Sequence, residues 1–389
     1  MSASIARTPT RTQTTVKLRG VGIEELYPAG RLTAAQRATA AAGLDALLLT
    51  PGSDLRYLTG YDAREGERLT CLVLPAEGEP TLIVPVLERP DAEAAPGTGY
   101  RIVDHADGTD PWPLVRAALP GPVRAVGLAD RMWAQQVLAL RDALPGAAQR
   151  LASDVLREMR IRKSPAEVAA LAEAGAAIDA VHLRMGEWLR PGRTEREVAA
   201  DLAAAIRAAG HAAVDFVIVA AGPNGASPHH GTSDRPIGAG EPVVVDIGGT
   251  MPSGYRSDCT RTYVAGGSAP AEFADYYAVL WEAQRAAVAA VAPGVTAEAL
   301  DAVARDVIAA AGFGDAFLHR TGHGIGLDGH EEPYVVTGNP RPMEPGMAFS
   351  IEPGIYLAGR HGARIEDIVV CTGDGVRRLN TTTTELVTL

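Results

Sequence analysis

The most informative segment of this chain reads P-V-V-V-D-I-G-G-T-M-P-S-G-Y-R-S-D-C-T-R-T at residues 242–262. Its apolar run predicts a buried strand that ends at Asp246, just before two glycines. An acid in that position is costly to bury unless something pairs with it. Asp258 follows twelve residues later, a spacing that lets one β-hairpin bring both carboxylates together. Taken singly, the two acids also fit a turn cap and an exposed strand residue. Alternation turns Cys259 to the opposite face, where we expect core.

Three more potential metal ligands occur later in the chain. His323 stands in T-G-H-G-I-G, where the flanking glycines allow close backbone approach. This segment does not fit a dinucleotide fingerprint, because its third glycine is misplaced and no βαβ unit surrounds it. Glu352 occupies S-I-E-P-G-I-Y, and Glu366 occupies A-R-I-E-D-I-V-V. Strand alternation places Arg364 on the face of Glu366, where a simple cross-strand ion pair is the alternative explanation.

Together, these four carboxylates and one histidine predict a metal centre. Buried like charges repel one another, so four clustered acids require compensating cations. One catalytic zinc ion takes three protein ligands, whereas a pair of ions ~3.5–4 Å apart can use the whole set and share an activated water. Oxygen-rich ligands without sulfur favour hard ions such as Mn²⁺, with Co²⁺, Fe²⁺ or Zn²⁺ as alternatives.

The chain as a whole predicts an α+β protein with two domains. A tail at 1–20 precedes a smaller α/β domain at 21–157, in which apolar strands alternate with Ala-rich helices. A larger domain follows at 160–389. Its elements are expected in the order helix pair, sheet, helix pair, sheet, which hints at a duplicated half.

Capping boxes mark where helices begin. Ser164 and Glu167 predict the first helix of the larger domain, which we expect to run to about Trp188. Thr33 and Gln36 fit the same pattern for the first helix of the smaller domain.

The composition of the chain argues against several classes of protein. The net charge of -11 makes a nucleic-acid partner improbable, because phosphate binding needs clustered Lys and Arg. Lysine catalysis is disfavoured, because Lys17 and Lys163 are the only lysines and Lys163 sits in a polar R-I-R-K-S-P stretch. Three widely spaced cysteines argue against a disulfide framework and fit the cytoplasm. No apolar run approaches the ~20 residues of a membrane span. The basic, acid-free tail fits a disordered segment or, more loosely, a transit peptide.

Five segments carry a resemblance to the pita-bread metallopeptidases, and within that family to aminopeptidase P and prolidase. They are V-V-V-D-I-G-G, S-D-C-T-R-T, T-G-H-G-I-G-L, S-I-E-P-G-I-Y and R-I-E-D-I-V-V, in the family's order. The region 160–389 is similar to the pita-bread catalytic domain. The segment D-L-R-Y-L-T-G-Y at 54–61 resembles the creatinase-type N-terminal domain that such enzymes carry.

The resemblance implies a full set of metal ligands. Asp258 and Glu366 would bridge both ions, Asp246 would complete one site, and His323 with Glu352 would complete the other. Glu352 would also shuttle a proton as general base and acid.

The resemblance also implies roles for residues beyond the ligands. His229 in S-P-H-H-G-T-S-D-R and His330 in G-L-D-G-H-E-E-P match two family histidines of the substrate pocket. Either can hydrogen-bond the scissile carbonyl or the oxyanion. The adjacent His230 is the alternative to His229. Arg364 matches a family arginine that meets the substrate or orients Glu366.

The expected function is hydrolysis of the peptide bond preceding proline by a metal-bridging hydroxide, in an Xaa-Pro aminopeptidase or Xaa-Pro dipeptidase. Its partners are proline-containing peptides, and the family implies a homodimer or homotetramer. The alternatives are a creatinase-like or methionine aminopeptidase-like enzyme and a non-enzymatic peptide-binding module. The complete ligand set and the additional N-terminal domain disfavour all three. A serine hydrolase is disfavoured because no G-x-S-x-G elbow occurs. The preferred substrate length stays open.

Overall fold

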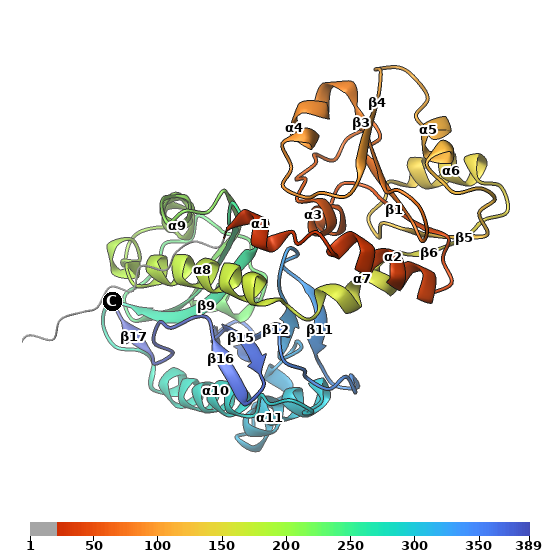
Figure 1. The fold of residues 1–389 in the computed structure, drawn as a ribbon. Helices are drawn as coiled ribbons and strands as arrows, with labels where there is room; N and C mark the ends of the chain where they lie inside the picture. Colours follow the sequence, from red (N-terminus) through yellow and green to blue (C-terminus); the bar gives the residue numbers. More distant parts are fainter. Residues whose placement is uncertain (1–21) are drawn as a thin grey trace, which may run out of the picture.

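A computed structural model of the protein describes residues 22–389, so the expected tail at 1–20 lies outside the described residues. Figure 1 shows a smaller N-terminal body, coloured red to yellow, beside a larger body that holds the green and blue elements. The mixture of helices and sheets fits the expected α+β class. No helix within residues 22–389 is long and apolar enough to cross a membrane.

The smaller domain is built on a six-stranded mixed sheet with the strand order β4-β3-β2-β1-β5-β6. Helices cover both of its faces, so the central strand β1 is buried throughout: Leu47 and Leu49 enter one core cluster, and Ala46 and Leu48 enter another. The elements of this part are α1 (Ile23–Leu26), α2 (Arg31–Ala41), β1 (Ala46–Leu49), α3 (Ser53–Thr59), β2 (Cys71–Pro75), β3 (Thr81–Pro85), η1 (Val86–Glu88), α4 (Arg89–Glu93), β4 (Arg101–His105), α5 (Trp112–Ala117), β5 (Ala125–Leu128), α6 (Ala134–Ala143), β6 (Ala148–Leu151) and α7 (Ser153–Arg160).

The capping box predicted at Thr33 and Gln36 is wrong. Helix α2 begins at Arg31, so its N-cap is Gly30, three residues before Thr33, and its N-terminus has no side-chain cap. The Gln36 amide instead donates to the carbonyl oxygens of Pro75 and Gly78, each at 2.9 Å. Tertiary contact with the β2–β3 turn has therefore replaced the local cap.

In the larger domain, helix pairs alternate with sheets as predicted. Helices α8 and α9 pack on a four-stranded sheet of order β17-β9-β8-β7, and α10 and α11 pack on a five-stranded sheet of order β11-β10-β12-β15-β16. The two helix pairs lie on opposite outer sides, with the sheets between them (Figure 1). The elements are α8 (Pro165–His182), η2 (Met185–Glu187), α9 (Glu195–Ala208), β7 (Ala213–Ala221), η3 (Gly222–Ala226), β8 (Glu241–Thr250), β9 (Arg256–Ala265), α10 (Ala271–Ala289), α11 (Ala297–Ala310), η4 (Gly314–Ala316), β10 (Gly322–Gly324), β11 (Glu331–Val335), β12 (Ala348–Ile351), β13 (Gly354–Leu357), β14 (His361–Arg364), β15 (Asp367–Thr372), β16 (Gly375–Arg378) and β17 (Val387–Thr388).

The capping box at the start of α8 is confirmed. The Ser164 hydroxyl accepts from the backbone N–H of Glu167, and the Glu167 carboxylate accepts from the backbone N–H of Ser164. The predicted end near Trp188 is wrong, because α8 stops at His182 and a short 3₁₀ helix follows. The change of path lets Met185 enter the core shared with the β8–β9 sheet.

The strand that carries Asp246 does not end there, contrary to the sequence prediction. β8 continues through both glycines to Thr250 and stays paired with β9 along its length. The glycines serve close packing instead of a turn. A Cβ atom at Gly248 would lie 2.5 Å from the Phe216 ring and 2.6 Å from the Ser257 carbonyl oxygen.

The connection between the domains is rich in buried charge. Arg160, at the end of α7, forms ion pairs with Asp54 of the smaller domain at 2.7 Å and with Asp328 at 2.7 Å. Lys163 is not in the polar setting that its neighbours suggested, because its side chain is 1% exposed and Nζ contacts Glu331 at 2.5 Å. These contacts tie the β10–β11 loop to the segment that joins the domains.

Candidate metal centre

Side chains from distant parts of the larger domain meet in one cavity of ≈ 490 Å³. Phe216, Ile218 and Pro228 give it an apolar side. Its lining includes every site candidate named from the sequence except His230, the alternative to His229: His229, Asp246, Asp258, His323, His330, Glu352, Arg364 and Glu366. The structure therefore brings together residues that span more than 130 positions of sequence.

The β8–β9 hairpin delivers the two aspartates to one face. Asp246 pairs in register with Thr260, and Gly248 pairs with Asp258, so the aspartates are diagonal neighbours two residues apart. Both are buried. Cys259 points to the other face and is fully buried in the core under α8 and α9, as predicted.

Two glutamates approach the aspartates from the other half of the domain. Glu352 lies directly after β12 and Glu366 directly before β15, and the pairing of Ile351 with Asp367 holds them side by side. The hairpin β13–β14 runs between them, with Gly354 opposite Arg364. Sheet register therefore places Glu352 beside Glu366, just as it places Asp246 beside Asp258.

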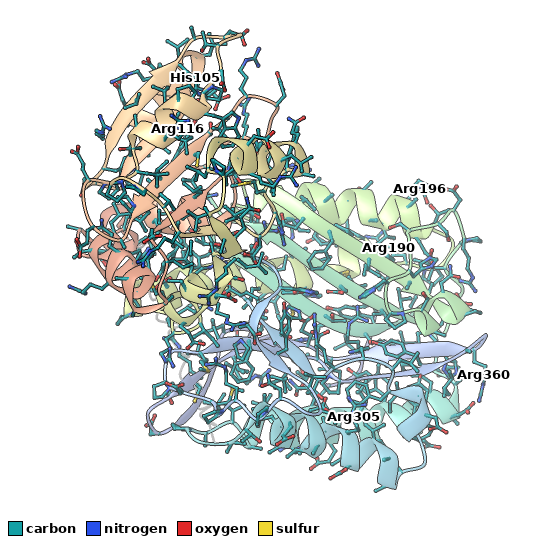
Figure 2. All side chains as sticks on the ribbon, turned by 90° about the vertical axis from the view of Figure 1, so that its right-hand side faces the viewer. His105, Arg116, Arg190, Arg196, Arg305 and Arg360 are labelled. Carbon is teal, nitrogen blue, oxygen red and sulfur yellow. The ribbon has the colours of Figure 1, made fainter. Side chains whose placement is uncertain are left out.

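His323 sits on the short strand β10, which is anchored from behind by α11. The buried Asp301 of α11 accepts hydrogen bonds from the backbone N–H of Thr321 at 3.1 Å and from its hydroxyl at 2.8 Å. The Arg305 guanidinium also donates to the Asp301 carboxylate. Figure 2 shows Arg305 on the outer helices of this half of the larger domain. The His323 Nδ1 atom lies 3.1 Å from the carbonyl oxygen of Gly324, which can only accept, so Nδ1 carries the proton. The other nitrogen, Nε2, faces the carboxylates, 3.2 Å from Glu352 and 3.7 Å from Asp258.

The potential ligand atoms form three overlapping groups, within each of which they lie within 4.8 Å of one another. The groups are Asp246, Asp258 and Glu366; His323, Glu352 and Glu366; and Asp258, His323 and His330. Asp258, His323 and Glu366 each belong to two groups, so these three side chains connect the cluster.

The electrostatics of the cluster call for bound cations. Burial, followed by repulsion from Asp246, raises the pKa of Asp258 well above its usual value, and burial with repulsion from Asp258 does the same to the pKa of Glu366. For Glu352, burial acts to raise the pKa, but the hydrogen bond and charge of His323 outweigh it and lower the pKa to about 2. Without added positive charge, the centre cannot hold all its acids ionised at low cost.

Several carboxylate oxygens in the cluster lack a hydrogen-bond partner among the described residues, and such oxygens suit the binding of divalent ions. Asp246 Oδ2 accepts from Arg364 at 2.6 Å, whereas Asp246 Oδ1 is buried without any hydrogen-bond partner. Glu366 Oε2 accepts from Thr260 at 2.7 Å and Glu352 Oε1 from Ser350 at 2.9 Å, so each glutamate keeps its other oxygen for a further partner. A buried acceptor left unpaired is costly, and a hard cation is the partner that an oxygen-rich set prefers.

Arg364 stands at the centre of a hydrogen-bond network behind the ligands. Besides Asp246, its guanidinium donates to the Thr260 hydroxyl at 3.1 Å and to the Tyr356 hydroxyl at 2.9 Å. The structure has no direct hydrogen bond from Arg364 to Glu366 within the described residues. Thr260 links the two instead, because its hydroxyl donates to Glu366.

The comparisons with known proteins agree with this geometry. Residues 169–373 match metallopeptidase family M24, and residues 31–162 match the creatinase/prolidase N-terminal domain. The chain belongs to metallopeptidase family M24. The expected pita-bread catalytic domain, creatinase-type N-terminal domain and metallopeptidase class are thereby confirmed.

Several relatives of this M24 enzyme carry dipeptidase names. This chain is 55% identical over 365 residues to the probable dipeptidase PepE of Mycobacterium tuberculosis, a match that covers 93% of this chain and 96% of that protein. It is 37% identical to the Xaa-Pro dipeptidase of Lactobacillus helveticus, covering 85% and 91%. The crystal structure of dipeptidase PepE from Mycobacterium ulcerans superimposes with a TM-score of 0.88 at 55% identity, covering 94% of this chain and 98% of that one.

The structure separates the two adjacent histidines of the M24 chain. His229 lines the cavity. His230 turns away, and its Nε2 lies 2.9 Å from the fully buried carboxylate of Glu195 at the start of α9. The Glu195 carboxylate also accepts from the backbone N–H of Ala221 at 2.8 Å and from the Ser233 hydroxyl at 2.6 Å. His230 thus helps to fix the loop that presents His229.

Two polar residues of the cavity, besides its apolar side, were missed by sequence reasoning. His319 contacts the Tyr356 hydroxyl at 2.8 Å through Nε2, which connects it to Arg364. Arg320 donates to Nδ1 of His330 at 3.0 Å. The one signal available in sequence was proximity, because H-R-T-G-H places both residues within four positions of His323.

Proposed function

We propose that this M24 enzyme hydrolyses the peptide bond preceding proline in Xaa-Pro substrates, with two divalent ions held by Asp246, Asp258, His323, Glu352 and Glu366. The main support is the buried cluster in which four carboxylates and one imidazole bring ligand atoms within 4.8 Å of one another in overlapping groups. The names of the relatives, which include an Xaa-Pro dipeptidase at 37% identity, support the proline specificity.

The overlap of the three ligand groups supports different roles for the individual ligands. Asp258, His323 and Glu366 each belong to two groups, but His323 has only Nε2 to offer because its Nδ1 carries the proton. Asp258 and Glu366, whose carboxylates each have two oxygens, would therefore be shared by both ions. Asp246 would complete one site, and His323 with Glu352 the other. Manganese is our choice of ion, because the set is rich in oxygen and contains no sulfur.

The two ions would acidify a water and polarise the scissile carbonyl. Glu352 would take the proton of the attacking water and pass it to the proline nitrogen as that nitrogen leaves. Ser350, which donates to Glu352 at 2.9 Å, holds this carboxylate in place. His229 and His330 would donate to the oxygen that gains charge in the tetrahedral intermediate. Arg364 keeps Asp246 oriented by donating to its Oδ2.

The apolar side of the cavity supports recognition of the proline ring. Phe216, Ile218 and Pro228 line it beside His229, and such a surface suits a side chain with no polar group. A tertiary amide also needs no acceptor for an N–H in this position.

Hydrolysis of Ala-Pro, Ala-Ala and Ala-Pro-Ala by the Mn²⁺-loaded protein tests the proposed function. We expect Ala-Pro to be cleaved with a kcat/KM at least about 10-fold above that for Ala-Ala, because a preformed apolar pocket is worth ~1–3 kcal/mol. Comparison with Ala-Pro-Ala gives the preferred length. Rapid cleavage of Ala-Ala with none of Ala-Pro would refute the proline assignment.

The two adjacent histidines give a matched pair of variants. His229→Ala should lower kcat by roughly 100-fold, which is the usual cost of removing one oxyanion donor, and leave the melting temperature nearly unchanged. His230→Ala should leave Glu195 short of one partner and lower the melting temperature, with a smaller loss of kcat. Steady-state kinetics and thermal melts distinguish these outcomes, and the reverse pattern would assign the site role to His230.

We further propose a cytoplasmic homodimer. The three cysteines are free and buried, which fits a reducing compartment. Trp133 just before α6, Leu138 on α6 and Leu151 on the sheet-edge strand β6 are exposed, which supports an interface there. Sedimentation at twice the 40.6 kDa chain mass and cell fractionation test the two statements, and a monomer or a membrane-bound pool would refute them.

A further inference from the structure

The turn that carries His330, residues 328–331, is in contact with both the metal cavity and the smaller domain. His330 lines the metal cavity and also a second cavity of ≈ 520 Å³ that is lined by residues of both domains. Its Nδ1 atom lies 3.0 Å from the Arg320 guanidinium, which can only donate, so Nδ1 accepts and Nε2 carries the proton. His330 therefore offers a single N–H group to a substrate, and the position of the turn sets where this group points.

The two carboxylates at the ends of the turn share one guanidinium group. Nη2 of Arg160 donates to Asp328 Oδ2 at 2.7 Å and to Glu331 Oε2 at 2.5 Å. The other oxygen of each carboxylate also has a partner: Asp328 Oδ1 accepts from the Ser53 hydroxyl at 2.8 Å, and Glu331 Oε1 accepts from Lys163 at 2.5 Å. Because both carboxylates are largely buried, these charge-assisted hydrogen bonds are stronger than ion pairs on an open surface. They fix the first and last residues of the turn relative to Arg160.

Arg160 also connects the turn to the smaller domain. Its Nη1 atom donates to Asp54 at 2.7 Å. Asp54 and Ser53, the residue that donates to Asp328, are the first two residues of α3. In Figure 1, α3 lies on the side of the smaller domain that faces the larger one. Arg160 is 12% exposed at the end of α7, so the start of α3 and the turn contact one largely buried guanidinium from two sides.

We propose that Arg160 is a positioning residue, which fixes the turn 328–331 so that the Nε2–H group of His330 points at the scissile carbonyl. The inference rests on the proposed oxyanion role of His330 and gives the smaller domain a part in catalysis. An oxyanion donor acts only when it lies ~2.7–3.1 Å from the developing charge, and a displacement of ~1 Å can cost roughly 100-fold in rate. Without Arg160, the two carboxylates of the turn would repel each other and push its ends apart.

A double-mutant cycle between Arg160 and His330 tests the proposal, with Ala-Pro as the substrate of the Mn²⁺-loaded full chain. His330→Ala should lower kcat by roughly 100-fold. Arg160→Met should lower kcat by roughly 10- to 100-fold and change KM by less than about 3-fold, because the misplaced donor acts on the transition state. In the His330→Ala background, Arg160→Met should lower kcat by less than about 3-fold further, since the residue through which it acts is already gone. Arg160→Lys, which keeps the charge without the planar fork, should fall between the wild type and Arg160→Met.

A second variant tests the contact with the smaller domain without leaving a buried charge unpaired. Ser53→Ala removes one neutral donor to the turn and should lower kcat by roughly 2- to 5-fold, again only when His330 is present. This cycle carries the test if Arg160→Met fails to fold, which thermal melts of each variant show. Arg162→Met is the matched control: Arg162 lies two residues from Arg160 and pairs with Glu344 instead of the turn, so its loss should change kcat by less than about 2-fold.

Hydrogen exchange gives a measurement that does not depend on turnover. In Arg160→Met, the peptide that contains residues 325–331 should exchange at least about 10-fold faster than in the wild type, while peptides from α10 should exchange at unchanged rates. Unchanged protection of the turn would overturn the proposal. Losses of kcat that multiply in the double variant of an active enzyme would also overturn it, because Arg160 would then act independently of His330. A wild type that does not cleave Ala-Pro would instead refute the proposed Xaa-Pro function, and the role of Arg160 with it.

Discussion

Replacing Asp258 with alanine is expected to lower kcat/KM for Ala-Pro by at least about 1,000-fold, equivalent to ~4 kcal/mol of transition-state stabilisation. Asp258 is buried, belongs to two of the three ligand groups and lies diagonally opposite Asp246 on the hairpin. Its loss would remove a ligand shared by both ions, so the metal content should fall together with the activity. Steady-state kinetics and metal analysis of the same preparation measure both effects.

Two further variants control this prediction. Asp258→Asn keeps the shape of the side chain and removes its charge, so it should lose activity to a similar extent. Asp275→Ala removes an exposed acid from α10 and should behave as the wild type. An Asp258→Ala protein that folds and keeps activity within tenfold of the wild type would show that this residue is not a shared ligand.

Removal of metal is expected to lower the melting temperature by roughly 10 °C at pH 8, and by much less at pH 5. A ligand that is present at 1,000 times its dissociation constant stabilises the folded state by ~4 kcal/mol, and each kcal/mol shifts the melting temperature of a domain of the size of residues 160–389 by ~2–4 °C. Because metal ligands bind in their deprotonated forms, this stabilisation grows with pH.

The metal-free protein should itself become less stable as pH rises. The folded-state pKa values of Asp258 and Glu366 are raised above the unfolded values of ~3.9 and ~4.3, so the unfolded chain releases these protons first and stability falls as pH rises above ~4. The pKa of His323 is also raised: burial opposes this shift, but Glu352 outweighs it. The stability due to His323 is full below ~6.5 and is lost as pH rises through the folded value. Glu352 works in the opposite direction only at low pH, because its depressed pKa removes stability as pH falls from ~4.3 towards 2.

Thermal melts with and without EDTA at pH 5, 6.5 and 8 measure this effect. The difference between the two melting temperatures should widen with pH in the wild type and shrink in Asp258→Asn. A difference that stayed constant or narrowed with rising pH would contradict a buried carboxylate centre that is neutralised by cations.

The approach of Asp246 to Asp258 was predictable because it depends on constraints that are local in sequence. The spacing of Asp246 and Asp258 needs one hairpin, and the strand pattern around Cys259 fixes which face each residue takes. Even so, Gly248 was misinterpreted as part of a turn, because the Phe216 ring that requires a glycine there comes from another strand.

Features that depend on contacts between distant segments could not be predicted. Lys163 reads as a surface residue until Glu331, far along the chain, is seen to pair with it. His229 and His230 are equivalent in sequence, and the buried Glu195 distinguishes them in space. Arg320 looks ordinary in H-R-T-G-H, and its place in the cavity wall and its hydrogen bond to His330 are visible only in the structure.

The number of divalent ions bound per chain tests the central claim most directly. The protein would be dialysed against excess Mn²⁺, freed of unbound metal and analysed by inductively coupled plasma mass spectrometry, beside Asp258→Ala. The account predicts two ions per wild-type chain, with catalytic activity rising as the second ion binds, and fewer than two in the variant. A fully active wild type that holds a single ion or none would contradict it.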